Sequence, residues 1–317
     1  MTTHLLSSVA ETVYWTGRLI ERTESTSRIV AAHANMVLDL PSTVAVDWHP
    51  LLQLTGTMEG FSEHYEASTA ESIFAHLITD TRNPGSVVRS IGQARENMRI
   101  TRSVMPRETW QTINKLHFYL QPLSDRTLPE HRRFSVLAHV IGECQKAFGQ
   151  LWGTLTHDLT FFFLDMGRQI ERSDMTTRVL AVRAESLVAA NRDPDDDPYA
   201  DVQWMSALRS LSALQMFRRR RPVLFPGYAA LEFLLSDEDF PRAVRHCLER
   251  FRDTADRAGA SSEVLSRCDR LISDVMDADV HALVESGLGE FMDEVQLGLI
   301  ELHNGVAEKF FPPLQPA

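Results

Sequence analysis

The chain has 317 residues, of which 44% are hydrophobic and 24% are charged, and its formal net charge at pH 7 is −11. This composition is typical of a folded protein of one or two domains and excludes a disordered chain. The acidic balance argues against a nucleic-acid partner, because neutralising phosphates requires a surplus of Lys and Arg. The three cysteines form no CxxC pair and their number is odd, which makes a poor disulfide framework and favours a reducing, cytoplasmic location.

No stretch has the pattern of a targeting or membrane-spanning segment. The amino-terminal sequence MTTHLLSSVAETVYW lacks the basic and apolar regions of a secretory signal. The most apolar run, LTFFFLDMG, is far shorter than the ~20 residues that cross a bilayer. We therefore expect a soluble cytoplasmic protein with no membrane partner.

Apolar residues recur at intervals of three and four along nearly the whole chain, which predicts an all-α protein. In chain order, the first predicted helices cover residues 5–38, 48–54 and 67–78, one that opens at Pro84, one that opens at Pro106, and residues 133–152. The remaining predicted helices cover residues 156–190, 202–219, 229–235, 241–257, 261–276 and 280–307. The acidic stretch NRDPDDDPYAD, with its two prolines, predicts a loop between the helices at residues 156–190 and 202–219.

One charged dodecamer occurs twice. GRLIERTESTSR covers residues 17–28 and GRQIERSDMTTR covers residues 167–178, so the offset is 150, and seven of the twelve positions are identical. Two further similarities follow in the same order, one that pairs Trp48 with Trp204 and one that pairs the stretch after Leu77 with the stretch after Leu234. Their offsets are 156 and 157. Repeated helical units bury their apolar faces against each other.

This internal similarity predicts how the chain is organised. We expect a single all-α domain over residues 1–317, a duplicated helical bundle whose two related halves, about 1–125 and 150–317, pack around a shared core and are joined by a helical connector.

A helical projection places the charged residues of each dodecamer on one face. In the first copy they are Arg18, Glu21, Arg22, Glu24 and Arg28, and in the second copy Arg168, Glu171, Arg172, Asp174 and Arg178. The exclusive use of Arg rather than Lys suits buried or bidentate geometry. Three interpretations remain open: a lock in which the arginines of one copy bind the carboxylates of the other, a pocket that grips phosphate or carboxylate, and a solvated face with weak ion pairs.

Other candidate sites are weaker. Arg95 and Arg99, in ARENMR, lie one helical turn apart and either line the same polar cavity or serve the structure. The run Arg218–Arg221 is either a charged helix end or a site for an acidic or phosphorylated partner. None of the twelve histidines has Glu three residues before it, so no di-metal site is expected. The chain also lacks phosphate-binding glycine motifs, so we expect no metal and no intrinsic cofactor.

Four separated stretches resemble the bacterial alpha-E family, which is named for a predicted α-helical domain with a repeated Glu–Arg motif. They are LLSSVAETVYWTGRLIERTESTSRIV, NPGSVVRSIGQARENMRITRSVMPRETWQTIN, MGRQIERSDMTTRVL and FLLSDEDFPRAVRHCLERF. By this resemblance the defining pairs are Glu21–Arg22 and Glu171–Arg172, and Glu24, Arg28, Asp174 and Arg178 also match.

The resemblance implies a function. Members of the family are typically encoded beside, or fused to, a circularly permuted ATP-grasp ligase, which implies a role in ATP-dependent amide formation on a peptide substrate. ATP and Mg²⁺ would then enter through the ligase partner. We expect an accessory or scaffold component that is itself non-catalytic. The alternatives are an enzyme in its own right, with Glu21 and Glu171 as acid or base groups and the arginines as anion holders, and a plain interaction module.

Overall fold

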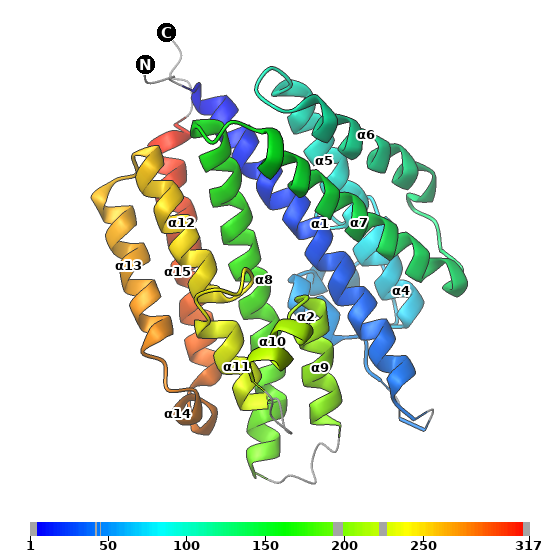
Figure 1. Ribbon diagram of the computed structural model, residues 1–317. Coiled ribbons are helices and arrows are strands. Elements are labelled where there is room, and N and C mark those ends of the chain that lie inside the picture. The colour runs from blue at the N-terminus through cyan, green and yellow to red at the C-terminus, as the bar shows by residue number, and fades with distance from the viewer. Residues whose placement is uncertain (1–4, 42, 45, 193–198, 222–226, 313–317) are drawn as a thin grey trace.

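The computed structural model describes residues 5–41, 43–44, 46–192, 199–221 and 227–312. For residues 184–192 it describes the backbone alone. All regular structure in these ranges is helical, without a strand, so the predicted all-α class is confirmed (Figure 1). No helix in these ranges combines the length and the apolar character that crossing a bilayer requires. Most of the predicted acidic loop falls on residues 193–198, outside the described ranges.

The helices divide at a long return segment in the middle of the chain. The first half forms α1 (Ser7–Asp39), α2 (Pro50–Thr55), α3 (Met58–Ser62), α4 (Ala70–Phe74), the π-helix η1 (Ala75–Thr79), α5 (Val87–Ile100), α6 (Arg107–Leu120), the 3₁₀-helix η2 (Gln121–Leu123) and the return helix α7 (Glu130–Thr154). The second half forms α8 (Leu159–Arg192), α9 (Ala200–Ser210), α10 (Leu214–Arg220), α11 (Gly227–Ser236), α12 (Val244–Ala258), α13 (Ser262–Met276), α14 (Val280–Glu285) and α15 (Leu288–Phe310).

The helices α1 and α8 lie side by side at the centre of the molecule (Figure 1). The helices α5 and α7 pack on α1, whereas α12 and α15 pack on α8. The hydrogen bonds between the charged side chains of α1 and α8 join residues that are always 147 to 153 positions apart. The backbone contacts of the two helices lie at residues 14–17 and 164–168, and these ion pairs lie at residues 18–22 and 168–172, so the contacts advance together along both helices. The helices α1 and α8 are therefore parallel, and α7 makes this possible by returning the chain to the end at which α1 begins (Figure 1).

Two glycines allow the backbones of α1 and α8 to touch where the helices cross. A Cβ atom on Gly17 would collide with the carbonyl oxygen of Leu164, and a Cβ atom on Gly167 would collide with that of Tyr14. Only glycine permits so close an approach of two backbones. Each glycine is the first residue of its dodecamer, so the repeated sequence marks the crossing point and places the charged residues that follow against the other helix.

One continuous hydrophobic cluster runs through the described residues and draws on both halves of the chain. It includes Ile20 and Ile91 from the first half and Leu180, Leu234 and Leu299 from the second, each at most 2% exposed. The origin of the two halves in a duplication remains a prediction.

Several helix boundaries differ from the predicted ones. The predicted helix 202–219 is broken between α9 and α10, where Ser212 has a φ of +55°. The predicted helix 280–307 is likewise broken before α15, at Gly287 with a φ of +103°. Neither break interrupts the spacing of apolar residues, which explains why the sequence pattern did not reveal them.

The repeated prolines do not open helices as predicted. Pro84 and Pro241 lie in turns, and the helices that follow begin three residues later, at Val87 and Val244. The predicted helix 67–78 begins at Ala70 and changes at Ala75 into the π-helix η1. The π-helix ends this element, since Asp80 is extended, so no helical turn follows in which a shift of the apolar spacing could reveal it.

Candidate functional site

The carboxylates of α1 and α8 are bound by the arginines of the opposite helix. Glu171 accepts from Nε of Arg18 at 2.8 Å and from Nε of Arg22 at 2.5 Å. Glu21 accepts from Nη2 of Arg172 at 2.8 Å and from Nε of Arg168 at 3.2 Å. The side chains of Glu21 and Glu171 are 0% and 2% exposed. This is the contact pattern of a lock between the two dodecamers, and it is not that of a solvated face.

The local sequence explains the reciprocity of these contacts. In each dodecamer the two arginines stand one helical turn apart, with the glutamate between them in the order Arg-x-x-Glu-Arg. When two such helices lie parallel and in register, the arginine pair of each helix straddles the glutamate of the other. A carboxylate has two oxygens and can accept from two guanidiniums, so each buried glutamate binds both arginines of the opposite helix.

A further arginine, outside the dodecamers, completes the cluster. Arg242 lies in the turn before α12, donates from Nη1 to Glu21 at 2.6 Å and from Nη2 to Glu24 at 3.0 Å, and has a side chain that is 8% exposed. The same turn is fixed by Arg172, which donates to the carbonyl of Pro241 at 3.1 Å. Sequence reasoning missed Arg242, because its counterpart at the offset of 157 is Gly85 and no repeat points to it. The position of Arg242 directly after the repeated proline, Pro241, is the one feature of the sequence that could have pointed to it.

The electrostatic environment keeps both central carboxylates ionised. Burial alone raises the pKa of Glu21, but the guanidiniums of Arg172, Arg242 and Arg168 outweigh it and hold that pKa far below its ordinary range. The pKa of Glu171 is also lowered, against its burial, by the guanidiniums of Arg22 and Arg18. A carboxylate that stays ionised and already accepts several hydrogen bonds is a poor general acid or base near neutral pH.

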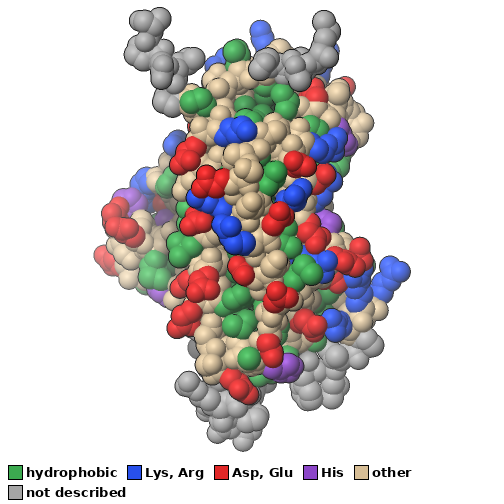
Figure 2. Space-filling model, turned by 90° about the vertical axis from the view of Figure 1, so that its left-hand side faces the viewer, with side chains coloured by type: hydrophobic (Ala, Val, Ile, Leu, Met, Phe, Trp, Pro, Cys, Tyr) green, Lys and Arg blue, Asp and Glu red, His purple; other side chains and the backbone are tan. Residues whose placement is uncertain are grey.

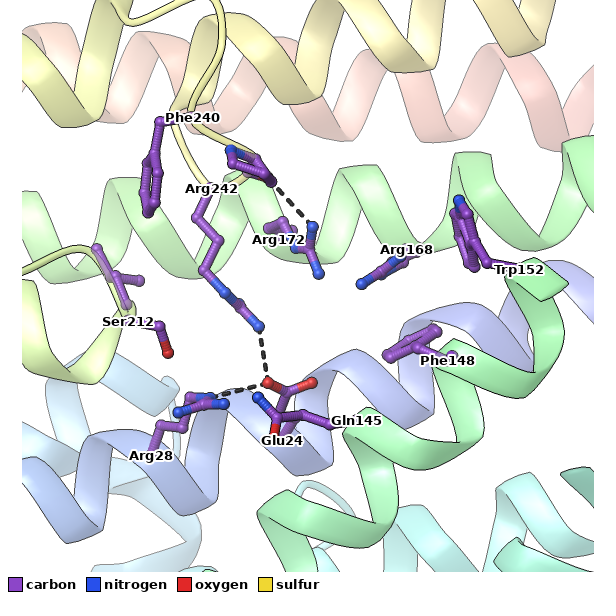
Figure 3. Close-up of a pocket in the computed structure, with 13 residues that line it drawn as sticks. Glu24, Arg28, Gln145, Phe148, Trp152, Arg168, Arg172, Ser212, Phe240 and Arg242 are labelled. Atoms are coloured by element: carbon purple, nitrogen blue, oxygen red, sulfur yellow. Dashed lines mark hydrogen bonds and ion pairs between the residues drawn. The ribbon is translucent and has the colours of Figure 1, made fainter. Parts of the chain in front are cut away.

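A pocket of about 390 Å³ opens beside this cluster, between α1, α7, α8 and the turn before α12 (Figure 3). Its walls contain four arginines, three aromatic side chains and a single carboxylate. The lining residues are Glu24, Arg28, Gln145, Phe148, Gly149, Trp152, Arg168, Arg172, Leu211, Ser212, Phe240, Pro241 and Arg242. The labelled guanidinium groups in Figure 3 surround the same central space.

Two aromatic rings of α7 hold one of these arginines in place. The guanidinium carbon of Arg168 lies 3.9 Å from the ring centroid of Phe148 and 4.4 Å from that of Trp152. Burial, together with the like charge of Arg172, lowers the pKa of Arg168 to about 10. Glu21, at 3.2 Å, is the one carboxylate that pairs with Arg168 among the described residues, and it is shared with Arg172 and Arg242.

The second dodecamer has an equivalent ion pair that takes no part in the pocket. Arg178 donates to Asp174 at 2.9 Å, just as Arg28 donates to Glu24 at 2.8 Å. Neither Asp174 nor Arg178 lines the pocket. Burial raises the pKa of Asp174 above its ordinary value.

Of the two interpretations of Arg95 and Arg99, the contacts match the structural one, and neither residue lines the pocket. Arg95 donates to Asn114 of α6 at 2.7 Å, and Arg99 pairs with Glu96 at the surface at 2.6 Å. On α5 it is Asn97 that faces α1, because its amide approaches the carbonyl of Thr12. The two arginines therefore point away from the Glu–Arg interface.

Two of the four arginines in the run Arg218–Arg221 are paired with neighbouring carboxylates. Arg220 pairs with Asp237 and Asp239, and Arg221 pairs with Glu232 at 3.2 Å. These contacts match the interpretation as a charged structural end. The other interpretation, a site for an acidic or phosphorylated partner, stays a prediction.

The described residues contain no group of three or more His, Cys, Asp or Glu side chains placed to hold a metal ion. Cys144, Cys247 and Cys268 are free and buried. Burial raises the pKa of Cys247 to about 12, so this thiol is not a nucleophile at neutral pH.

Fold and site together define an all-α domain in which two long parallel helices are joined by a buried Glu–Arg cluster. The chain belongs to the Alpha-E family, whose model is described as a predicted alpha-helical domain with a conserved ER motif and matches residues 5–311. The adjacent Glu–Arg pairs at 21–22 and 171–172 lie at the centre of the interface described above.

The curated relatives are themselves uncharacterized. The chain is similar to the uncharacterized protein Mb2597 of Mycobacterium bovis and to the uncharacterized proteins MT2643 and Rv2567 of Mycobacterium tuberculosis, each with 25% identity over 286 residues. The match covers 84% of this chain and 31% of each relative, so the chain spans about a third of their length. No solved structure matches the chain.

Proposed function

We propose that this chain is a non-catalytic accessory or scaffold component of a cytoplasmic ATP-grasp ligase system that forms peptide or amide bonds. The observation that carries the non-catalytic part is the state of Glu21 and Glu171. Both are buried and ionised, and their oxygens are occupied by arginines of the opposite helix. The enzyme alternative requires these same groups to exchange protons, which their lowered pKa values oppose.

The partnership rests on two supports of a different kind. One is the resemblance of the Glu–Arg stretches to a family whose members occur beside or fused to a circularly permuted ATP-grasp ligase. The other is the length of the curated relatives, in which this chain matches 31% of the polypeptide. A domain that is joined to further sequence in its relatives suits a role alongside another module. In this proposal ATP and Mg²⁺ bind to the ligase, and the peptide substrate is shared.

Reconstitution tests the proposal. The chain is combined with a circularly permuted ATP-grasp ligase from the same genome, ATP, Mg²⁺ and amino acids, and the products are identified by mass spectrometry. We expect the two proteins to co-purify and product formation to require both. Full product formation by the ligase alone would refute an accessory role.

The variant Glu171→Gln separates the accessory role from catalysis. If Glu171 is structural, the variant lowers the melting temperature, and product formation falls only with the folded fraction. A variant that melts like the wild type but forms no product would show that Glu171 is catalytic, and would overturn the non-catalytic assignment.

A further inference from the structure

The pocket beside the Glu–Arg cluster has the construction of a ligand site, and the family description assigns none to it. We propose that it binds a small molecule whose head group is a doubly charged oxyanion, a phosphate monoester or a close pair of carboxylates, carried on an apolar or aromatic body. This inference goes beyond the accessory role and does not depend on a ligase partner.

The charge balance of the pocket is the first argument. Four guanidiniums line it, and the carboxylates that face them are Glu24 in the wall and Glu21 behind it, which leaves a formal excess of two positive charges. The nearby Asp165 is already paired with Arg250 at 3.0 Å. Uncompensated buried charge is costly, and an anion carrying two charges would neutralise it.

The acidic character of the rest of the molecule makes this excess distinctive. The whole chain carries a net charge of −11. On the face formed by α12, α13 and α15, acidic and basic side chains alternate over the surface (Figure 2). Ion pairs such as Arg252–Asp269 at 3.0 Å balance the charge there. The pocket, by contrast, has four arginines and a single carboxylate in its walls.

Free hydrogen-bond donors are the second argument. Among the described residues, Arg172 uses its terminal nitrogens for Glu21 and for the carbonyl of Pro241, and its Nε is fully buried, so the free donors belong to other arginines of the pocket. Among the same residues, Arg168 and Arg28 each donate through Nε alone, to Glu21 and to Glu24. Their planar terminal nitrogens suit the bidentate recognition of phosphate or carboxylate oxygens.

The size and the apolar walls of the pocket indicate the rest of the ligand. A volume of about 390 Å³ is that of a small-molecule site. Phe148 and Trp152 form one wall, where they also fix the guanidinium of Arg168, and Phe240 and Leu211 form another. These surfaces would bury an apolar body while the arginines hold the charged head.

Calorimetric titration of the purified full-length chain tests the proposal with three probes: inorganic phosphate, phenyl phosphate and phenylmalonate. We expect phenyl phosphate to bind more tightly than inorganic phosphate, because the aromatic walls add contact area. Comparison of phenyl phosphate with phenylmalonate then distinguishes a phosphate head from a pair of carboxylates. If none of the three binds at millimolar concentration, the proposal is overturned.

Arg28 and Arg178 supply a matched pair of variants, since each forms the same ion pair one helical turn away and only Arg28 lines the pocket. We expect Arg28→Gln to weaken binding of the better probe about tenfold or more, because it removes a charge-assisted contact. Arg178→Gln should leave binding unchanged. Equal losses in the two variants, or no loss in Arg28→Gln, would contradict the proposed site.

Two glycines of α7 supply a second pair that does not disturb the ion pairs. A Cβ atom on Gly149 or on Gly142 would meet only open space, but only Gly149 lines the pocket. Gly149→Glu places a competing carboxylate in the pocket and should abolish binding while the melting temperature is kept. Gly142→Glu makes the same change of charge on the same helix and should bind like the wild type. Binding that survives in Gly149→Glu would place the ligand elsewhere and refute the proposal.

Discussion

The ion pairs of this chain differ in how far they are removed from water, and that difference decides what each one does. Glu21 is fully buried and accepts from three arginines. Glu96 and Arg99 form a pair with each other at the surface, where their side chains are 41% and 56% exposed. An exposed pair contributes little, because water solvates both partners when it breaks. When one member of a buried pair is removed, the other charge stays buried without a counter-charge, which lowers the free energy of unfolding.

Replacement of Glu21 by Gln should therefore destabilise the protein strongly. The amide cannot balance the buried charges of Arg172 and Arg242, and the expected loss in the free energy of unfolding is about 3–5 kcal/mol. Urea unfolding followed by circular dichroism measures it. Glu96→Gln is the control and should unfold like the wild type. A Glu21→Gln variant as stable as its control would mean that the cluster is not a lock.

The burial of His33 should make the stability of the protein depend on pH. Burial lowers the pKa of His33 to about 4 from its ordinary 6.5. The unfolded chain therefore binds a proton more readily than the folded chain, so the contribution of His33 is fully present above pH 6.5 and declines as the pH falls toward 4. From about pH 7 to about pH 5, His33 should account for about 2 kcal/mol of lost stability.

His33→Gln should remove that part of the acid sensitivity. The comparison is the change in the free energy of unfolding between the two pH values, in the wild type and in the variant. The carboxylates Glu21 and Glu171, whose pKa values are lowered, act in the same direction but only below their ordinary value of 4.5. An identical pH dependence in both proteins would contradict the assignment to His33.

At the scale of the elements, the sequence predicted the two central helices, α1 and α8, well. The repeated dodecamer marked both helices, and contact between its charged residues was one of the three interpretations that the sequence left open. The register of the two helices was not predicted, although Gly17 and Gly167, which open the two copies, lie where the backbones meet. The break at Ser212 was not accessible, because it changes the backbone without changing the spacing of apolar residues. The π turn at Ala75–Thr79 was not accessible either, because no helical turn follows it.

The helix crossing predicts the effect of a single methyl group. Gly17→Ala should destabilise the protein by about 1–3 kcal/mol, because the added Cβ collides with the carbonyl oxygen of Leu164. Gly142→Ala, at an open position of α7, should be neutral or stabilising by up to about 1 kcal/mol, as helix propensity favours Ala. Thermal unfolding compares them. Two variants with the same stability would argue against contact of the backbones.

At the scale of the whole molecule, composition and periodicity sufficed for the fold class, but the site needed contacts that no repeat encodes. The pocket takes its walls from α7, from the turn that carries Arg242 and from the break at Ser212. These segments meet only through tertiary packing. Each lies where the sequence pattern gave no prediction or placed a helix boundary wrongly. Arg242 was missed for this reason, although it contacts two residues that the pattern did single out.

The shared core predicts that the molecule unfolds as one unit. Side chains of both halves belong to one hydrophobic cluster, and the buried charges of α1 are balanced by those of α8. Differential scanning calorimetry should show a single transition whose calorimetric and van't Hoff enthalpies agree. Two separate transitions would mean that the halves are independent domains.

The reciprocal pairing also has a consequence for synthesis on the ribosome. Glu21 and its neighbours emerge early, but the arginines that neutralise them from α8 follow about 150 residues later, as the separations of 147 and 151 positions require. Until then α1 cannot bury its charged face and stays in contact with water. The amino-terminal half must therefore wait, incompletely folded, for α8 to leave the exit tunnel before the centre of the protein can close.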